Sequence, residues 1–213
     1  MNREDDPACI IASLLLQSNA IKLNPDNPFT WVSGIKSPIY CDNRVTLSYP
    51  QVRRQIALQF VKLIKEHHPD AKVIAGVATG AIAHGILVAE ELGLPFVYVR
   101  QASKSHGLAN QVEGRILPGE KTIVIEDLVS TGKSSIAAVR ALREAGFDVS
   151  ALNAIFSYGL EEANIRMKQN NCTLQTLCGF DCLLETAVQD KIISQEQREL
   201  VEKWQLDPWG YGR

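Results

Sequence analysis

Two acids and a hydroxyl-rich turn stand together in the middle of the chain. Glu126 and Asp127 follow a β-branched run at residues 123–125, and residues 130–135 then carry four hydroxyls, a glycine and Lys133. Ionised carboxylates accept hydrogen bonds from sugar hydroxyls, whereas hydroxyls, an ammonium group and backbone N–H groups near a glycine can surround an anion. These residue types predict a site for a ribose phosphate.

The elements on either side would place this turn where ligands bind. Residues 123–125 have the pattern of a strand buried on both faces, and residues 134–146 have helical periodicity. The turn would then join the carboxyl end of a strand to the positive end of a helix dipole. The alternative is an ordinary helix start, in which Ser130 or Thr131 caps the helix and the acids face water.

Two common nucleotide motifs do not explain the turn. Gly132-Lys133-Ser134 resembles the end of a Walker A loop, but Asp127 stands where that motif requires its first glycine. A Gly-x-Gly-x-x-Gly fingerprint follows none of the expected strands. The site is therefore predicted to belong to another class of phosphate-binding protein.

Residues 126–134, Glu-Asp-Leu-Val-Ser-Thr-Gly-Lys-Ser, resemble the phosphoribosyl pyrophosphate (PRPP) signature of type I phosphoribosyltransferases. Residues 29–44 and 100–107 resemble segments of the orotate phosphoribosyltransferases, and three ordered motifs are more specific than one. The resemblance runs from about residue 29 to residue 158. It implies transfer of the 5-phosphoribosyl group from PRPP to orotate, giving orotidine 5'-monophosphate and pyrophosphate in pyrimidine (UMP) biosynthesis.

The resemblance also implies roles for individual residues. Glu126 and Asp127 would bind the ribose hydroxyls, residues 130–134 would bind the 5-phosphate, and Ser130 would also touch orotate. The complete set expected to contact substrate is Phe29, Lys36, Arg100, Lys104, His106, Glu126, Asp127, Leu128, Val129, Ser130, Thr131, Gly132, Lys133 and Ser134.

A basic loop carries the expected contacts with pyrophosphate. By resemblance, Arg100, Lys104 and His106 would bind this leaving group, and the loop at 100–107 would reach into the partner subunit's site of a homodimer. Lys104, His106 and Asp127 are the expected catalytic residues. Mg²⁺ would be the cofactor, bound mainly through PRPP and not by direct protein ligands. No nucleophilic side chain is required, because orotate supplies its own ring nitrogen.

The sequence departs from the best-known pattern of the family at three positions. Gln101 and Gly80 each stand where some members have a lysine, and Tyr158 stands where some have an arginine that contacts orotate. The orotate carboxylate therefore requires another partner, for which backbone N–H groups and Ser130 are candidates.

Composition limits the remaining choices. The chain has 213 residues and is 46% hydrophobic, which fits one α/β domain with a hood built mainly by residues 20–47, to which the C-terminal segment could contribute. A net charge of −2 argues against nucleic-acid binding. The apolar stretch at residues 10–16 is too short to span a membrane and acids precede it, so we expect a cytoplasmic protein.

The expected elements alternate as in a type I phosphoribosyltransferase-like parallel sheet flanked by helices. Strands are predicted at residues 72–77, 96–99 and 149–156, and another strand is predicted to end at residue 125. A first helix is predicted from Asp5 or Asp6 to Leu16, and a second from a cap at Ser48 to Glu66. A third helix follows the strand at residues 72–77 and ends at residue 92, and a fourth runs from 134 to 145. A capping box at 194–197 begins the last predicted helix. His84 is expected to be structural, and the five cysteines, which lack a Cys-x-x-Cys pair, indicate thiols and not a zinc site.

Two other functions are compatible with these motifs. One is a phosphoribosyltransferase that acts on a purine base, which the segment at residues 29–44 disfavours. The other is a regulator that keeps the PRPP pocket, has lost catalysis and binds nucleic acid or protein, but the chain has no excess of basic residues.

Overall fold

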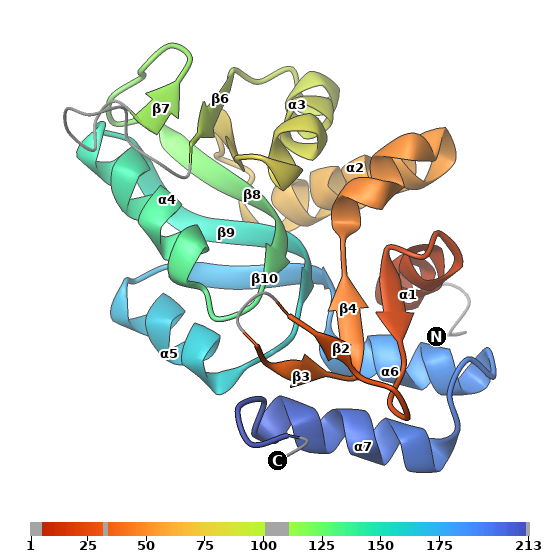
Figure 1. The fold of residues 1–213 in the computed structure, drawn as a ribbon. Helices are drawn as coiled ribbons and strands as arrows, with labels where there is room; N and C mark the ends of the chain where they lie inside the picture. The colour runs from red at the N-terminus through yellow and green to blue at the C-terminus, as the bar shows by residue number, and fades with distance from the viewer. Residues whose placement is uncertain (1–5, 32–33, 101–110, 212–213) are drawn as a thin grey trace.

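A six-stranded sheet forms the centre of the computed structural model, which describes residues 6–31, 34–100 and 111–211 (Figure 1). All neighbouring strands are parallel except β7, which is antiparallel to β6. The prediction of a mostly parallel α/β sheet is confirmed. The order across the sheet is β10 (Thr173–Cys178), β9 (Asp148–Ser157), β8 (Lys121–Val129), β5 (Val73–Val77), β6 (Phe96–Val99) and β7 (Val112–Glu113).

Apolar side chains cover both faces of this sheet. On β5 and β8, Ile74 and Ile123 belong to one core cluster, whereas Val73 and Val124 belong to the other. A strand with two buried faces must be apolar at successive positions, which is the pattern that the sequence shows. The first cluster contains residues of α1 (Pro7–Gln17), α2 (Pro50–His67), α3 (Gly80–Leu92), α6 (Phe180–Gln189) and α7 (Gln195–Leu206).

The opposite face of the sheet is covered by α4 (Lys133–Glu144) and α5 (Glu161–Gln169), as Figure 1 shows. Ile136 and Val139 of α4 and Met167 of α5 pack into the second cluster. No helix within the described ranges is long and apolar enough to cross a membrane.

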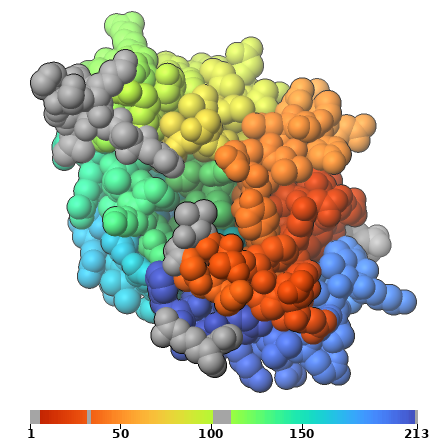
Figure 2. Space-filling view, viewed as in Figure 1, coloured from red at the N-terminus to blue at the C-terminus, as the bar shows by residue number. Residues whose placement is uncertain are grey.

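A small hood lies beside the sheet. Strand β1 (Ile21–Leu23) pairs with β4 (Ile39–Cys41), β2 (Phe29–Thr30) pairs with β3 (Lys36–Ser37), and the short helix η2 (Asn43–Ser48) leads to α2. The C-terminal segment packs against this hood. Gln197 Nε2 donates to Asp26 Oδ2 at 2.6 Å, and the rings of Trp31 and Trp204 are 5.6 Å apart. In the space-filling view, the orange hood accordingly lies next to the blue C-terminal residues (Figure 2).

Helix starts test the predictions from local sequence. Asp6 caps α1 through a bond from Ala8 N of 2.9 Å, and the predicted capping box at Ser194 is present. The prediction that Ser48 caps the next helix was wrong. Ser48 ends η2, and α2 begins with Pro50, whose fixed φ suits the first helical position.

The functional strand β8 is longer than predicted. It continues past Ile125 to Val129 because the next residues pair with β9, with Glu126 opposite Ala154 and Val129 opposite Ser157. Glu126 and Asp127 are therefore held in a sheet, and only the hydroxyl-rich residues form the turn.

Candidate active site

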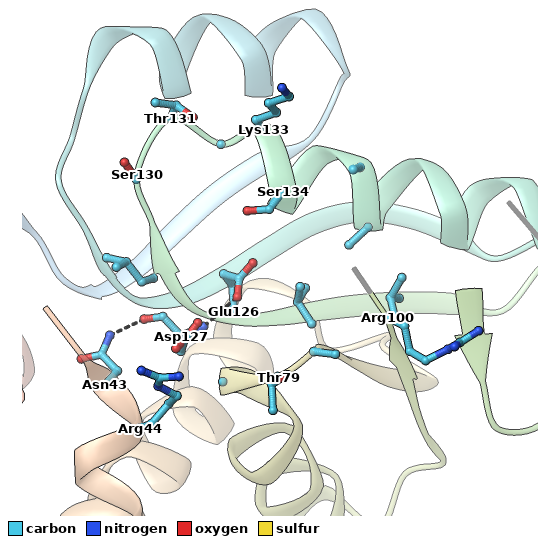
Figure 3. A pocket seen from close by; sticks show the side chains of 18 of the residues that line it. Asn43, Arg44, Thr79, Arg100, Glu126, Asp127, Ser130, Thr131, Lys133 and Ser134 are labelled. Carbon is cyan, nitrogen blue, oxygen red and sulfur yellow. Dashed lines mark hydrogen bonds between the residues drawn. The ribbon is translucent and has the colours of Figure 1, made fainter. Parts of the chain in front are cut away.

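An open cavity of about 790 Å³ lies at the carboxyl ends of the central strands. The predicted turn and the two acids line it, together with residues 77–80 after β5, Arg100 after β6, and residues 41–44 of the hood. Figure 3 shows Asn43 and Arg44 beside Asp127, and Arg100 on the other side of Glu126. The tertiary structure thus brings together residues from four separate parts of the sequence.

The turn between β8 and α4 has the geometry of an anion site. Gly132 has a φ of +74°, which side chains rarely adopt, and it directly precedes α4. Gly132 is the cap residue of this helix, and no side chain among the described residues makes a cap hydrogen bond there, which contradicts the alternative in which Ser130 or Thr131 is an ordinary cap. The first N–H groups of a helix lack partners within it, and Lys133 and Ser134 at this end line the cavity.

A neighbouring helix holds the turn in place. Arg166 Nε of α5 donates to Thr131 O at 3.0 Å, and Ala163 and Met167 approach Gly132. The sequence analysis missed these residues, because nothing local marks a helix 35 residues away as the support of a turn.

The two acids have unusual electrostatics. Burial raises the pKa of Glu126 well above its ordinary value, and the negative charge of Asp127 raises it further. Burial also raises the pKa of Asp127. Glu126, which is 4% exposed, accepts from Ser135 Oγ and from Asp127 N, each at 3.1 Å. Because the environment opposes two adjacent charges, we assign the shared proton of the unliganded pair to Glu126.

A chain of hydrogen bonds from the hood positions Asp127. Asn43 Nδ2 donates to Asp127 O at 2.5 Å, Thr46 Oγ1 donates to Asn43 O at 2.6 Å, and His84 Nε2 lies 3.2 Å from Thr46 Oγ1. Burial lowers the pKa of His84 to about 4, so the imidazole is neutral and donates through Nε2. The expected structural role of His84 is confirmed, and Asn43 is a positioning residue that sequence reasoning overlooked.

The Asp127 side chain leaves no room for a side chain at position 80. A Cβ added at Gly80 would overlap the Asp127 carboxylate. Any larger side chain at this position would therefore displace the acid from its present position.

Several predicted residues lie outside the cavity. Lys36 Nζ donates to Thr30 Oγ1 at 2.9 Å within the β2–β3 hairpin, and the Phe29 ring packs 5.7 Å from the Tyr40 ring. Leu128 lines the cavity, but the Val129 side chain is fully buried in the core. Contacts of substrate with Phe29, Lys36 or the Val129 side chain would require a different arrangement from this one.

The basic loop is represented by Arg100 alone. Arg100 Nε pairs with Glu113 Oε1 at 3.0 Å, and the residue lines the cavity. Gln101, Lys104 and His106 lie outside the described residues. Their assignments stay predictions.

Tyr158 does not face the cavity. It is 2% exposed, and its ring lies 5.4 Å from Trp31 and 5.5 Å from Trp204, in an aromatic cluster that joins the hood to α7. The absent arginine is thus replaced by a core residue and not by another substrate contact. Arg44, which sequence reasoning passed over at the end of the hood segment, supplies a cation at the cavity.

Comparisons with known proteins agree with this geometry. The family model described as "Phosphoribosyl transferase domain" matches residues 49–166, more than half of the chain. The orotate phosphoribosyltransferase of Porphyromonas gingivalis is 50% identical over 203 residues, covering 94% of this chain and 97% of the relative. This chain belongs to the orotate phosphoribosyltransferase family. The enzyme of that name from Bacillus caldolyticus is also 50% identical, over 94% of this chain and 98% of the relative.

The fold comparison supports the same membership in the orotate phosphoribosyltransferase family. The crystal structure of orotate phosphoribosyltransferase from Aeropyrum pernix superposes with a TM-score of 0.75 at 25% identity, covering 84% of this chain and 98% of that chain. The acid pair and the turn lie within residues 49–166, whereas the hood residues of the cavity precede them. The family model thus covers the acid pair and the turn, and the hood residues 41–44 of the cavity lie outside it.

The contact between Gly80 and Asp127 leads to a first prediction. Gly80→Ala should lower kcat/KM by about tenfold, because the new methyl group would displace the Asp127 carboxylate from the substrate that we expect it to bind. A hydrogen bond to a charged group contributes about 1.5–3 kcal/mol. The Tm should change by less than about 3 °C, since alanine favours a helix. Steady-state kinetics and thermal melting measure both effects. Gly179→Ala is the matched control, because its Cβ would enter open space. Equal kinetics for the two variants would contradict the prediction.

The raised pKa of the buried Glu126 should also make stability depend on pH. The folded protein keeps a proton on Glu126 at a pH where the unfolded chain, with an ordinary pKa of 4.5, has lost it. The native state then binds more protons, so stability falls as the pH rises above 4.5 toward the raised pKa.

Glu126→Gln should flatten this decline, because a neutral amide cannot ionise. Between about pH 5 and about pH 8, the Tm of the unliganded variant should fall less than that of the unchanged chain. The exposed Glu199→Gln is the control and should keep the original slope. Parallel curves for the Glu126 variant and the unchanged chain would exclude the assigned proton.

Proposed function

We propose that this protein transfers the 5-phosphoribosyl group from PRPP to orotate, giving orotidine 5'-monophosphate and pyrophosphate. The observation that carries the proposal is the pair of buried Glu126 and partly buried Asp127, which the turn joins to a helix start without a side-chain cap, in a chain half identical to orotate phosphoribosyltransferases over nearly its whole length. A pair of oxygen acceptors next to an anion site matches the ribose hydroxyls and the 5-phosphate of PRPP.

The turn would hold the phosphate end of PRPP. The hydroxyls of Ser130, Thr131 and Ser134 and the first N–H groups of α4 would donate to the 5-phosphate, and Lys133 would add charge. Glu126 and Asp127 would accept from the ribose hydroxyls. Fixing both ends of the sugar orients its anomeric carbon toward the attacking base.

The leaving group would be bound on the opposite side of the ribose. Displacement of pyrophosphate builds positive charge on the ribose and negative charge on the departing oxygens. Arg100 would stabilise the latter, together with Lys104 and His106 of the same loop. The backbone at residues 77–80 after β5, which lines the cavity, offers a second contact. Orotate attacks through its own ring nitrogen, so no side chain needs to act as a nucleophile.

The acid pair also fits a divalent cation that arrives with PRPP. Two adjacent carboxyls whose charges are opposed by burial would gain from positive charge at the ribose hydroxyls that they bind. Mg²⁺, when bound to PRPP, would neutralise part of the charge on pyrophosphate. We propose that Glu126 and Asp127 interact with the metal through these hydroxyls.

The proposed oligomeric state rests on the resemblance, and the proposed location rests on the sequence, in which the apolar stretch at residues 10–16 is short and follows acids. We propose a cytoplasmic homodimer in which the loop at residues 100–107 of one subunit completes the site of the other. PRPP and orotate would be its only substrates, with no requirement for nucleic acid or membrane.

The direct test follows the ultraviolet absorbance of orotate with PRPP, with and without Mg²⁺. Loss of orotate that depends on both PRPP and Mg²⁺ is expected, whereas adenine, guanine and hypoxanthine should not be consumed. Consumption of a purine base would favour the alternative of a purine-base phosphoribosyltransferase. PRPP binding without consumption of any base would favour the alternative of a regulator that has lost catalysis.

Arg44 gives this proposal a sharper prediction about the base. Its guanidinium lines the cavity near Asp127, and Asp42 holds it through bonds of 2.7 and 2.8 Å. Because Tyr158 is buried, we propose that Arg44 pairs with the orotate carboxylate. Arg44→Ala should raise the KM for orotate by about tenfold or more, with a much smaller change in the KM for PRPP.

Two comparisons distinguish a contact between Arg44 and the orotate carboxylate from a general disturbance of the site. Uracil lacks the carboxylate, so its weak competition with orotate should be unchanged in the Arg44 variant. Arg198→Ala, which removes an ion pair with Glu202 on α7, should leave both KM values unchanged. Equal losses of affinity for uracil and orotate would refute the carboxylate contact.

A further inference from the structure

Three of the five cysteines gather at the packing of α1 against α6, outside the cavity. Cys9 belongs to α1, Cys182 to α6, and Cys178 ends β10. Cys9 Sγ lies 3.4 Å from Cys182 Sγ, and both residues are partly exposed. In Figure 1, α1 and α6 lie side by side near the N-terminus. The proposed reaction uses none of these thiols.

The two closest thiols occupy equivalent helical positions. Cys9 is the third residue of α1 and Cys182 is the third residue of α6. Both lie in the first turn, where the positive end of the helix dipole favours a thiolate over a thiol. This placement makes each sulfur more reactive than a cysteine within a helix.

The surroundings of Cys182 add to this effect. Hydrogen bonding from Cys178 is the largest cause that lowers the pKa of the Cys182 thiol to about 6, with smaller contributions from Cys9 and Thr186. Partial burial and the charge of Asp6 oppose the shift. These surroundings favour the thiolate of Cys182, which is the nucleophilic form.

Cys178 differs from the other two thiols. It is fully buried, its Sγ lies 3.5 Å from Gly179 O, and its pKa is raised, first by its hydrogen bond to Cys182 and then by burial. A buried protonated thiol does not react with a dissolved oxidant. Its role is to stabilise the thiolate of Cys182.

The arrangement does not suit a metal ion. No group of three histidine, cysteine, aspartate or glutamate side chains in the structurally described part of the chain is placed to hold one. A disulfide requires a sulfur separation of about 2.05 Å, so Cys9 and Cys182 need to approach by little more than about 1 Å. Rotation of the two side chains at the helix starts can supply such a movement.

We propose that Cys182 and Cys9 form an oxidation site that is converted to a disulfide by a hydroperoxide. The Cys182 thiolate attacks one peroxide oxygen, which breaks the O–O bond, forms a sulfenic acid and, with one proton, releases water when the oxidant is H₂O₂. The Cys9 sulfur then attacks the Cys182 sulfur, the S–S bond forms, and the hydroxyl leaves as a second water. Two thiols are oxidised by two electrons, and one peroxide is reduced.

The disulfide would tie the start of α1 to the start of α6 across 173 residues of sequence. Because α1 continues into β1, and β1 pairs with β4, the bond would fix the connection between the hood and the sheet. Closing so long a loop restricts the unfolded chain. The oxidised protein should therefore melt about 5 °C or more above the reduced protein.

The test oxidises the full-length protein with one equivalent of H₂O₂ at neutral pH. Thiol titration under denaturing conditions should fall from five to three per chain, because two of the five cysteines are consumed. Peptide mapping without reductant should recover Cys9 linked to Cys182, and non-reducing electrophoresis should show a monomer. Five remaining thiols, a bond that involves Cys178, or a link between chains would each overturn the proposal.

Variants separate the two roles. Cys9→Ser should stop the reaction at a sulfenic acid on Cys182 that dimedone traps, whereas Cys182→Ser should keep all four remaining thiols. Cys172→Ser is the matched control, since burial raises the pKa of that thiol to about 11 and it should leave the Cys9–Cys182 bond unaffected. A further test uses the unchanged chain alone. If Cys182 reacts with iodoacetamide no faster than Cys172 does, the proposal is wrong.

Discussion

Asp127→Asn is expected to lower kcat/KM by about 10²- to 10³-fold, because hydrogen bonds to a charged acceptor are each worth about 1.5–3 kcal/mol. The amide keeps the shape of the side chain but loses its charge, and it replaces one acceptor by a donor. The amide can accept only through Oδ1, so contacts of ribose hydroxyls with both side-chain oxygens, and the charge of the acceptor, would be lost. The backbone oxygen that Asn43 holds is unchanged, so the turn should keep its position.

Stability should change in the opposite direction. Burial opposes the charge of Asp127, so a neutral amide at this position removes that cost. The Tm of the unliganded Asp127→Asn variant at neutral pH should therefore equal or exceed that of the unchanged chain, as is common where a site is optimised for function. Loss of activity with no loss of stability distinguishes a substrate contact from a structural residue.

Steady-state kinetics with orotate and PRPP, together with thermal melting, test both statements. Asp70→Asn is the matched control, because Asp70 forms an exposed ion pair with Lys121 on the surface. Such pairs contribute about 0–1 kcal/mol, and kcat/KM should not change. A variant at Asp127 that retains activity within about threefold would contradict the assignment of ribose binding to this carboxylate.

Lys104→Ala is expected to have the second large effect. If Lys104 stabilises the departing pyrophosphate, its removal should lower kcat by about 10²-fold, the size found when one transition-state contact is lost. The KM for orotate should change little. Lys62→Ala, on the exposed surface of α2, is the matched control. Unchanged turnover in the Lys104 variant would exclude this lysine from the leaving-group site.

Mixing two inactive variants then tests whether the loop is shared. In a hybrid dimer of Lys104→Ala with Asp127→Ala, sharing places the intact lysine of one subunit in the site that keeps Asp127. Random exchange makes about half of the dimers hybrids with one intact site each, so about a quarter of normal activity should return. Lys104→Ala exchanged with itself must stay inactive. No recovery after verified exchange would mean that each loop serves its own subunit.

Residues that are neighbours in sequence could be predicted before the fold was known. The strand, the acids, the turn and the helix at residues 122–145 form one continuous unit, so their types and spacing predict a phosphate site without tertiary information. The caps at Asp6 and Ser194 are equally local. The end of β8 was predicted too early, because Val129 is kept in the strand by pairing with Ser157 of β9.

Contacts between distant segments could not be predicted in this way. No local pattern indicates that the Asn43 side chain holds the backbone of Asp127, or that a glycine at position 80 leaves room for its carboxylate. The burial of Tyr158 depends on Trp204 near the end of the chain, and the approach of Cys9 to Cys182 depends on the packing of two helices.

The sequence by itself therefore determined the kind of ligand, through a contiguous turn whose hydrogen-bonding groups need only local geometry. The tertiary structure alone decided which acid is buried, which cation of the hood lines the cavity, and which thiols meet. Burial and separation in space set these properties, and both arise only when segments far apart in the chain pack together.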